Sequence, residues 1–227
     1  MRSNTEYKNE ALSILKGNWG ASVLAVIVYV AIVLLLLLPY EIKAFTMDPT
    51  DLKAAAGLAR WMGVYFIALF LIAGPLLIGL VNAFKRLLLA GDDKVVHNEL
   101  KIGFGNWLHH VWGYLLKTIL VALWSILFFI PGIIKSLAYA MTNYILVDHP
   151  ELSANRAIDL SQEMMRGHKY DLFYLYLGFA GWFILSMFTL GLGLFWLIPY
   201  AQVAQASFYQ DVKAEWEAKH QGVLSGS

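Results

Sequence analysis

Polar side chains recur inside the most apolar stretches of this sequence, where contact with lipid would be costly for them. They carry amides, hydroxyls and one ammonium group, and they are Asn82, Lys135, Tyr139, Asn143, Tyr200, Gln202 and Gln205. Tyr139 and Asn143 are four residues apart, and Gln202 and Gln205 are three apart, so each pair shares a helix face. These faces could line a polar cavity, or they could hydrogen-bond neighbouring helices together. The second interpretation is favoured, because no acidic residue joins the set.

The residue patterns typical of catalysis are missing. The chain has no cysteine and no His-Glu-x-x-His, Gly-x-Ser-x-Gly, Walker or Rossmann motif. His109 and His110 are adjacent, and adjacent residues on a helix point to different faces, so a shared metal ion is not expected. Amides and hydroxyls are poor acid–base catalysts at neutral pH. The sequence therefore predicts a protein that is not an enzyme and that needs no cofactor or metal.

Long stretches without charge indicate the class of protein. Hydrophobic residues make up 59% of the 227 residues and charged residues only 15%, whereas about a quarter of a soluble domain is charged. No charged residue occurs in the stretches 17–40, 61–84 and 172–210. A bilayer crossing takes roughly 20 apolar residues, so the first two stretches hold one crossing each and the third holds two. An all-α polytopic membrane protein is predicted.

Six transmembrane helices are expected, arranged as three hairpins. Their approximate ranges are 19–38, 61–84, 112–130, 133–147, 170–190 and 194–209. Pro39 is expected to end the first helix, because proline has no amide hydrogen to donate. Gly74-Pro75 predicts a kink in the second helix. Turns are predicted at Asp48-Pro49, Pro131-Gly132 and Gly191-Leu192-Gly193.

Three segments are too polar to cross a membrane and are expected to lie at its cytoplasmic surface: 5–16, 92–110 and 151–166. Val95 and Val96 belong to the apolar side of the second. In the third, Ser153 is a candidate N-cap, and Ile158 and Met165 supply an apolar side. The candidate contacts with lipid headgroups are Arg156, Arg166 and Lys169. Membrane lipids are the expected partners, and other membrane proteins remain an alternative.

The placement of positive charge predicts the orientation. With a cytoplasmic N-terminus, only Lys43, Lys53, Arg60 and Lys135 of the 17 Lys and Arg residues lie outside, and the other 13 lie inside. Both termini are therefore expected in the cytoplasm of a bacterial cell, with the chain in the inner membrane. A net charge of +1 gives no reason to expect a nucleic acid as a partner. Residues 1–220 are expected to form one domain, and 221–227 a flexible tail.

Similar strings before each hairpin suggest an internal repeat. Gly105-Asn106-Trp107 and Gly167-His168-Lys169 precede the last two hairpins, and Gly17-Asn18-Trp19 precedes the first. The next turn glycine follows at a similar distance in both later cases, 27 residues on at Gly132 and 26 residues on at Gly193. The matched spacing favours a repeat over the ordinary need for glycine at turns.

Several strings resemble a known family. They are Gly74-Pro75-Leu76, Ile130-Pro131-Gly132-Ile133-Ile134-Lys135, Asp148-His149-Pro150, Met165-Arg166-Gly167-His168-Lys169 and Pro199-Tyr200. In this order they resemble the bacterial integral membrane family catalogued as domain of unknown function 975, over about residues 5–212. The resemblance implies an inner-membrane protein and supplies no catalytic residue.

Two classes of function remain from the sequence. The first is a non-enzymatic membrane protein that acts through contacts with lipids or with partner proteins. The alternative is a transporter or channel for a small neutral solute, which would pass through a polar cavity between the second, fourth and sixth helices.

Overall fold

The computed structural model describes residues 1–48, 50, 52–91 and 99–224, and the elements among them are all helical. The α-helices are α1 (Asn4–Leu15), α2 (Trp19–Thr46), α3 (Leu52–Ala68), α4 (Gly74–Ala90), α6 (Trp107–Leu127), α7 (Phe129–Ala138), α8 (Thr142–Asp148), α9 (Ala154–Met164), α10 (Lys169–Phe188) and α11 (Leu194–Leu224). A π-helix, η1 (Leu69–Ala73), joins α3 to α4, and a 3₁₀-helix, η2 (Leu100–Phe104), precedes α6.

Five stretches of the described residues are long and apolar enough to cross a membrane. They are Trp19–Thr46, Lys53–Ala90, Trp107–Leu127, Phe129–Asp148 and Lys169–Phe188. The sixth predicted crossing, 194–209, is helical as the first half of α11 but is not among these five. The helix continues to Leu224, so it takes in the first four residues of the predicted tail.

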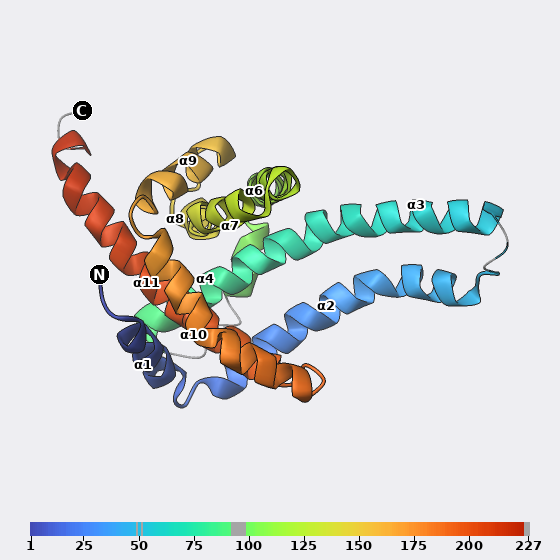
Figure 1. The fold of residues 1–227 in the computed structure, drawn as a ribbon, viewed down its shortest axis with the longest axis horizontal. Helices are drawn as coiled ribbons and strands as arrows, with labels where there is room; N and C mark the ends of the chain where they lie inside the picture. Colours follow the sequence, from blue (N-terminus) through green and yellow to red (C-terminus); the bar gives the residue numbers. More distant parts are fainter. Residues whose placement is uncertain (49, 51, 92–98, 225–227) are drawn as a thin grey trace.

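The first hairpin is longer than the sequence predicts. α2 continues past Pro39 to Thr46, so the prediction that Pro39 ends the helix is wrong. A proline inside a membrane helix is tolerated, because local adjustments satisfy the backbone groups that it frees. At the predicted turn, Asp48 Oδ1 accepts hydrogen bonds from the Thr50 amide at 2.9 Å and the Thr50 hydroxyl at 2.7 Å; Pro49 lies outside the described residues. Figure 1 shows the α2–α3 hairpin extending away from the other helices.

The predicted irregularity at Gly74-Pro75 takes the form of the π-helix η1, which lies immediately before it. Pro75 cannot donate a hydrogen bond to the carbonyl of Leu71, four residues earlier. The indole of Trp107, at the start of α6, donates to that carbonyl instead, at 2.7 Å. The proline therefore creates an acceptor that fixes the position of α6.

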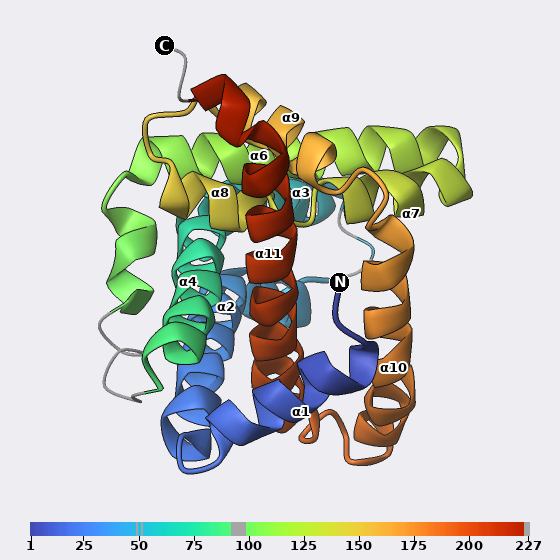
Figure 2. The ribbon, with the colours of Figure 1, turned by 90° about the vertical axis from the view of Figure 1, so that its left-hand side faces the viewer.

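The second hairpin turns earlier than expected. The break falls at Phe128, which is extended with φ −155° and ψ 129°, so the prediction of a turn at Pro131-Gly132 is wrong. Pro131 instead lies in the first turn of α7, where its missing amide hydrogen costs little. The predicted single helix 133–147 is also wrong, since residues 139–141 interrupt it between α7 and α8. α6 and α7 run across the direction of α4, α10 and α11 (Figure 2).

Two hairpins close through the same kind of contact. A Cβ added at Gly132 would lie 2.4 Å from Ser125 Oγ, and one added at Gly193 would lie 2.6 Å from Ser186 Oγ. Both serine hydroxyls donate to the carbonyl four residues earlier, at 2.8 Å. Glycine is thus required at both positions because the paired helices approach so closely.

The turns that lead into α2 and α10 have the same backbone geometry. Gly17 and Gly167 have φ of +93° and +95°, a region that favours glycine. Fourteen residues before them, Ser3 and Ser153 cap α1 and α9 by accepting hydrogen bonds from the amides of Glu6 and Arg156. Gly105 differs, with φ −62°. The repeat of whole hairpins stays a prediction.

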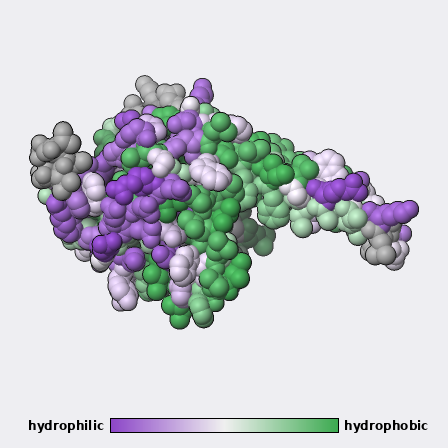
Figure 3. All heavy atoms as spheres, turned by 90° about the horizontal axis from the view of Figure 1, so that it is seen from above, coloured by the Kyte–Doolittle hydropathy of each residue, from purple (hydrophilic) through white to green (hydrophobic). Residues whose placement is uncertain are grey.

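The buried core lies where α4, α8 and α11 meet, around Phe84, Tyr144, Phe208 and Tyr209. α1 packs across α10 and α11 (Figure 2). Much of the remaining surface is apolar. Figure 3 shows hydrophobic residues across the middle of the molecule and along the α2–α3 hairpin, with hydrophilic residues at the left-hand end and at the hairpin tip.

Candidate functional site

A cavity of about 530 Å³ lies between α4, α6, α7, α8, α10 and α11. Its polar lining comes mainly from Lys117, Thr118, Ser136, Asn143, Tyr144, Tyr176, Gln202 and Gln205. Its apolar lining includes Leu77, Val81, Val121 and Ala122. None of the described residues that line it is Asp, Glu or His.

The cavity brings together three of the candidate site residues. Gln202 and Gln205 lie on one face of α11, as their spacing predicts, and Asn143 lies in the first turn of α8. The interruption at residues 139–141 separates Asn143 from Tyr139, although their spacing predicts a shared helix face. Sequence spacing predicts a shared face only while the helix is continuous.

Lys117 belongs to this site, and sequence reasoning missed it. Its ammonium donates to Asn143 Oδ1 at 3.4 Å. The charge pattern counts Lys117 among the cytoplasmic residues that precede a helix. Because α6 begins at Trp107, Lys117 lies in the middle of that helix instead. The signal in the sequence is Trp107 itself, an interfacial aromatic five residues before the expected start.

Two polar groups at the cavity have no hydrogen-bond partner among the described residues: the hydroxyl of Tyr144 and Oε1 of Gln202. Tyr144 is only 1% exposed, and its ring stacks on Tyr209 with centroids 4.7 Å apart. Buried polar groups are nearly always hydrogen-bonded. These two groups of cavity-lining residues therefore have unused hydrogen-bonding capacity.

The other four candidate residues lie elsewhere. Lys135 donates to Gln162 Oε1 at 3.2 Å and lies over the rings of Trp124 and Tyr139, at 5.0 and 5.7 Å from their centroids. Asn82 donates to Glu99 Oε2 at 2.6 Å. Tyr200 packs edge-on against Phe179, with centroids 4.9 Å apart. In these positions the polar side chains join neighbouring elements, as the bonding interpretation expects.

The candidate headgroup contacts surround α9. Arg156 and Arg166 are exposed, although Arg156 pairs with Glu163 at 3.0 Å, and Lys169 is half-buried. Ser153 caps the helix, as predicted. Ile158 and Met165 are buried against the protein, so the apolar side expected to enter the membrane packs inward instead. Of the second predicted surface segment, Val95 and Val96 lie outside the described residues.

An ionic cluster at the end of α8 joins three helices. Asp148 pairs with Lys85 of α4, and its Oδ2 accepts hydrogen bonds from Tyr209 at 2.8 Å and Lys213 at 2.9 Å, both on α11. The Lys85 side chain is only 4% exposed. The sequence places Lys85 directly after a charge-free stretch and Asp148 in the string Asp148-His149-Pro150, but it does not pair them, because they are far apart in the chain.

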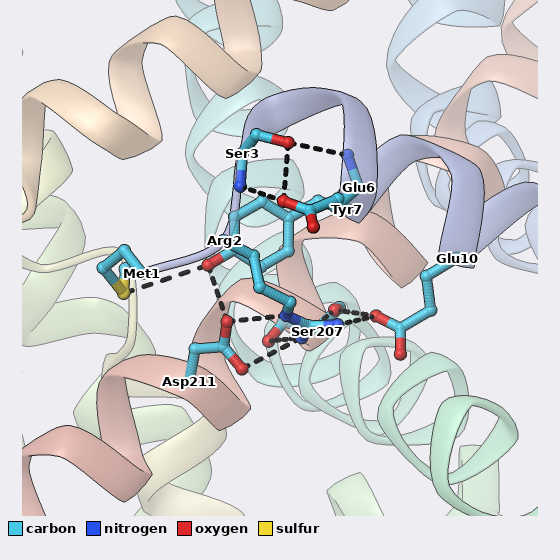
Figure 4. Close-up of polar contacts among 8 residues, drawn as sticks. All are labelled: Met1, Arg2, Ser3, Glu6, Tyr7, Glu10, Ser207 and Asp211. Carbon is cyan, nitrogen blue, oxygen red and sulfur yellow. Dashed lines mark hydrogen bonds and ion pairs between the residues drawn. The ribbon is translucent and has the colours of Figure 1, made fainter.

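A second cluster fastens α1 to α11 (Figure 4). Arg2 donates to both carboxylate oxygens of Asp211, at 2.8 and 2.9 Å, and the Tyr7 hydroxyl donates to the same carboxylate at 2.8 Å. Arg2 also pairs with Glu10 at 2.8 Å. Burial raises the pKa of Asp211, but the hydrogen bonds from Arg2 and Tyr7 outweigh burial and hold this pKa below its usual 3.8. The cluster was not predicted.

The described residues form an all-helical protein with five stretches long and apolar enough to cross a membrane and with many exposed apolar side chains, as expected of a membrane protein. Within that class, residues 126–216 match the model of the family described as protein of unknown function (DUF975). The match confirms the resemblance over the C-terminal part of the chain, including Asn143, Gln202 and Gln205. No curated protein and no solved structure matches the chain.

Proposed function

We propose that this chain is a non-enzymatic protein of the bacterial inner membrane that acts by binding membrane lipids. The cavity carries this proposal, because its lining joins a polar side with an apolar side. A lipid has the same division between headgroup and hydrocarbon. At about 530 Å³ the cavity falls within the usual size range of ligand sites.

The chemistry of the lining supports binding over catalysis. Its hydrogen-bonding groups are mostly amides and hydroxyls, which bind well but transfer protons poorly at neutral pH. The exposed surfaces of α2, α6 and α10 add to the support. Only 17%, 17% and 22% of the residues in their most apolar windows are buried, so most of these side chains are free to contact lipid.

Retention of lipid by the purified protein tests this function. In native mass spectrometry from a mild detergent, we expect the protein to keep lipid that is lost when Asn143→Leu and Gln205→Leu are combined. Asn155→Leu, on the exposed side of α9, is the control and should keep it. Equal retention in all three proteins would contradict lipid binding in the cavity.

A transporter of a small neutral solute is the second candidate. The observation in its favour is that the amides of Asn143, Gln202 and Gln205 line one cavity. In proteoliposomes, solute flux that the same double variant abolishes would favour transport. Lipid retention without flux would favour the first function.

The proposed orientation places both termini in the cytoplasm, because of the bias in positive charge. Since the chain has no cysteine, single cysteines can be labelled without background. We expect a membrane-impermeant maleimide to label Ala55→Cys, on α3, in intact spheroplasts, and to label Ala218→Cys, on α11, only after lysis. The reverse pattern would overturn the orientation.

A further inference from the structure

We infer that the cavity binds the anionic group of an amphiphile, a phosphate or carboxylate, through the ammonium of Lys117. This inference rests on the lipid-binding function proposed above. It adds the charge and chemical class of the ligand.

Lys117 is a cation without a counter-ion among the residues that the structure describes. It lies at the centre of α6, and its hydrogen bond goes to the neutral amide of Asn143. Lys85 differs, because it pairs with Asp148. An ammonium group held inside a protein, away from bulk water, is costly unless a charge or a polar cavity compensates it. A negatively charged ligand would supply that compensation.

The groups around Lys117 suit an anion. The hydroxyl of Tyr144 is buried without a partner among the described residues and can donate a hydrogen bond. The side-chain amides of Gln202 and Gln205 can donate as well. Oxygen atoms of phosphate and carboxylate groups accept such bonds, and bonds between ionised groups are the strongest of this kind.

The apolar wall favours an anion that carries a hydrocarbon part. Leu77 and Val81 of α4 face the same cavity as Val121 and Ala122 of α6. A free anion would leave this wall unoccupied, whereas an amphiphile would cover it with its chain. The ammonium group therefore favours a ligand with an anionic group, and the apolar wall favours one with a hydrocarbon chain.

Binding of short-chain lipids tests the inference. The full chain in a neutral detergent is titrated with dioctanoyl phosphatidylglycerol, with dioctanoylglycerol, which has the same chains but no anionic group, and with inorganic phosphate. We expect Lys117→Gln to weaken binding of phosphatidylglycerol about tenfold, as for loss of a charged hydrogen bond, and to leave binding of the uncharged dioctanoylglycerol unchanged. Lys117→Arg should retain binding, and Lys16→Gln, at an exposed position before α2, is the control.

A second variant covers the case in which Lys117→Gln fails to fold. Tyr144→Phe keeps the ring on Tyr209 and removes only the hydroxyl, and we expect it to weaken phosphatidylglycerol binding by a few-fold. Phosphate that binds as tightly as the lipid and depends on Lys117 would support the anion site and assign it to a free anion. Phosphatidylglycerol binding that neither variant changes would overturn the inference and leave lipid binding standing. Failure of both lipids to bind would overturn the proposed function as well.

Discussion

One continuous helical stretch, Lys53–Ala90, has two halves with opposite surroundings. α3 and α4 have 17 residues each and are equally hydrophobic on average. In α4, 12 residues are buried, whereas none of the described side chains of α3 is. Figure 1 shows α3 in the protruding hairpin and α4 among the other helices.

The comparison shows that hydrophobicity does not decide which half is packed by protein. Lipid tails are as apolar as leucine side chains, so either environment accepts an apolar helix. The presence of glycine does not decide it either, because both halves contain glycine: a Cβ would meet open space at Gly63 in α3 but would clash at Gly79 in α4. What distinguishes α4 is the pair of buried polar residues, Asn82 and Lys85, which need partners that lipid cannot supply.

The largest difference between the halves should come from charge. Lys85→Met removes a buried partner of Asp148, and we expect it to lower the free energy of unfolding by up to about 3 kcal/mol, since loss of one member of a buried pair is costly. Arg60→Met, on the exposed surface of α3, should change it by less than about 0.5 kcal/mol. Unfolding in mixed detergent, followed by circular dichroism, measures both. Equal effects would remove the distinction between the halves.

A smaller difference should come from glycine. A Cβ at Gly79 would lie 2.2 Å from the carbonyl oxygen of Leu100, so Gly79→Ala must displace η2, at a cost of about 1–3 kcal/mol. Gly63→Ala has no neighbour within 4 Å and should stabilise α3 by up to about 1 kcal/mol through helix propensity. The same unfolding measurement applies, and the two substitutions should have opposite signs. A neutral Gly79→Ala would show that η2 moves freely.

The smallest effect should appear in the free energy of unfolding at acid pH. It concerns Asp211, which lies in the packed region of the protein. The folded-state pKa of Asp211 is lowered, so its pairing stabilises the protein above pH 3.8 and is lost as the pH falls through the folded value. Asp211→Asn should therefore lower the free energy of unfolding at neutral pH by about 1 kcal/mol or less, because the pair is partly exposed. It should also reduce the loss of this free energy as the pH falls. Asp159→Asn, exposed on α9, is the control. A variant whose free energy of unfolding falls with acid pH as steeply as that of the original protein would contradict this role of Asp211.

The sequence predicted the helical membrane class and most helix positions, because buried helices of soluble proteins rarely have charge-free stretches of this length. It failed at the prolines. Pro39 and Pro131 both lie inside helices, since the neighbouring structure decides whether the freed carbonyl finds a partner. Leu71 shows the principle, because its carbonyl is satisfied by Trp107, 36 residues further along the chain.

The candidate site was predicted in part. The spacing of Gln202 and Gln205 was enough to place them together, because α11 is regular there. Lys117 was missed through an error of five residues in the start of α6. The partners of Asp148 and Asp211 could not be predicted, because single charges at the ends of apolar stretches do not specify which distant charge they meet.

The π-helix η1 has a consequence for the rotation of α3 about its own axis. A π-turn accommodates one residue more than an α-turn, and one residue corresponds to about 100° of rotation in an α-helix. The side chains of α3 are therefore out of phase with those of α4. Deleting one residue from Leu69–Ala73 would convert η1 into an ordinary α-turn and restore one side-chain period across the two halves. The single extra residue thus shifts by one position which residues of α3 continue a given face of α4.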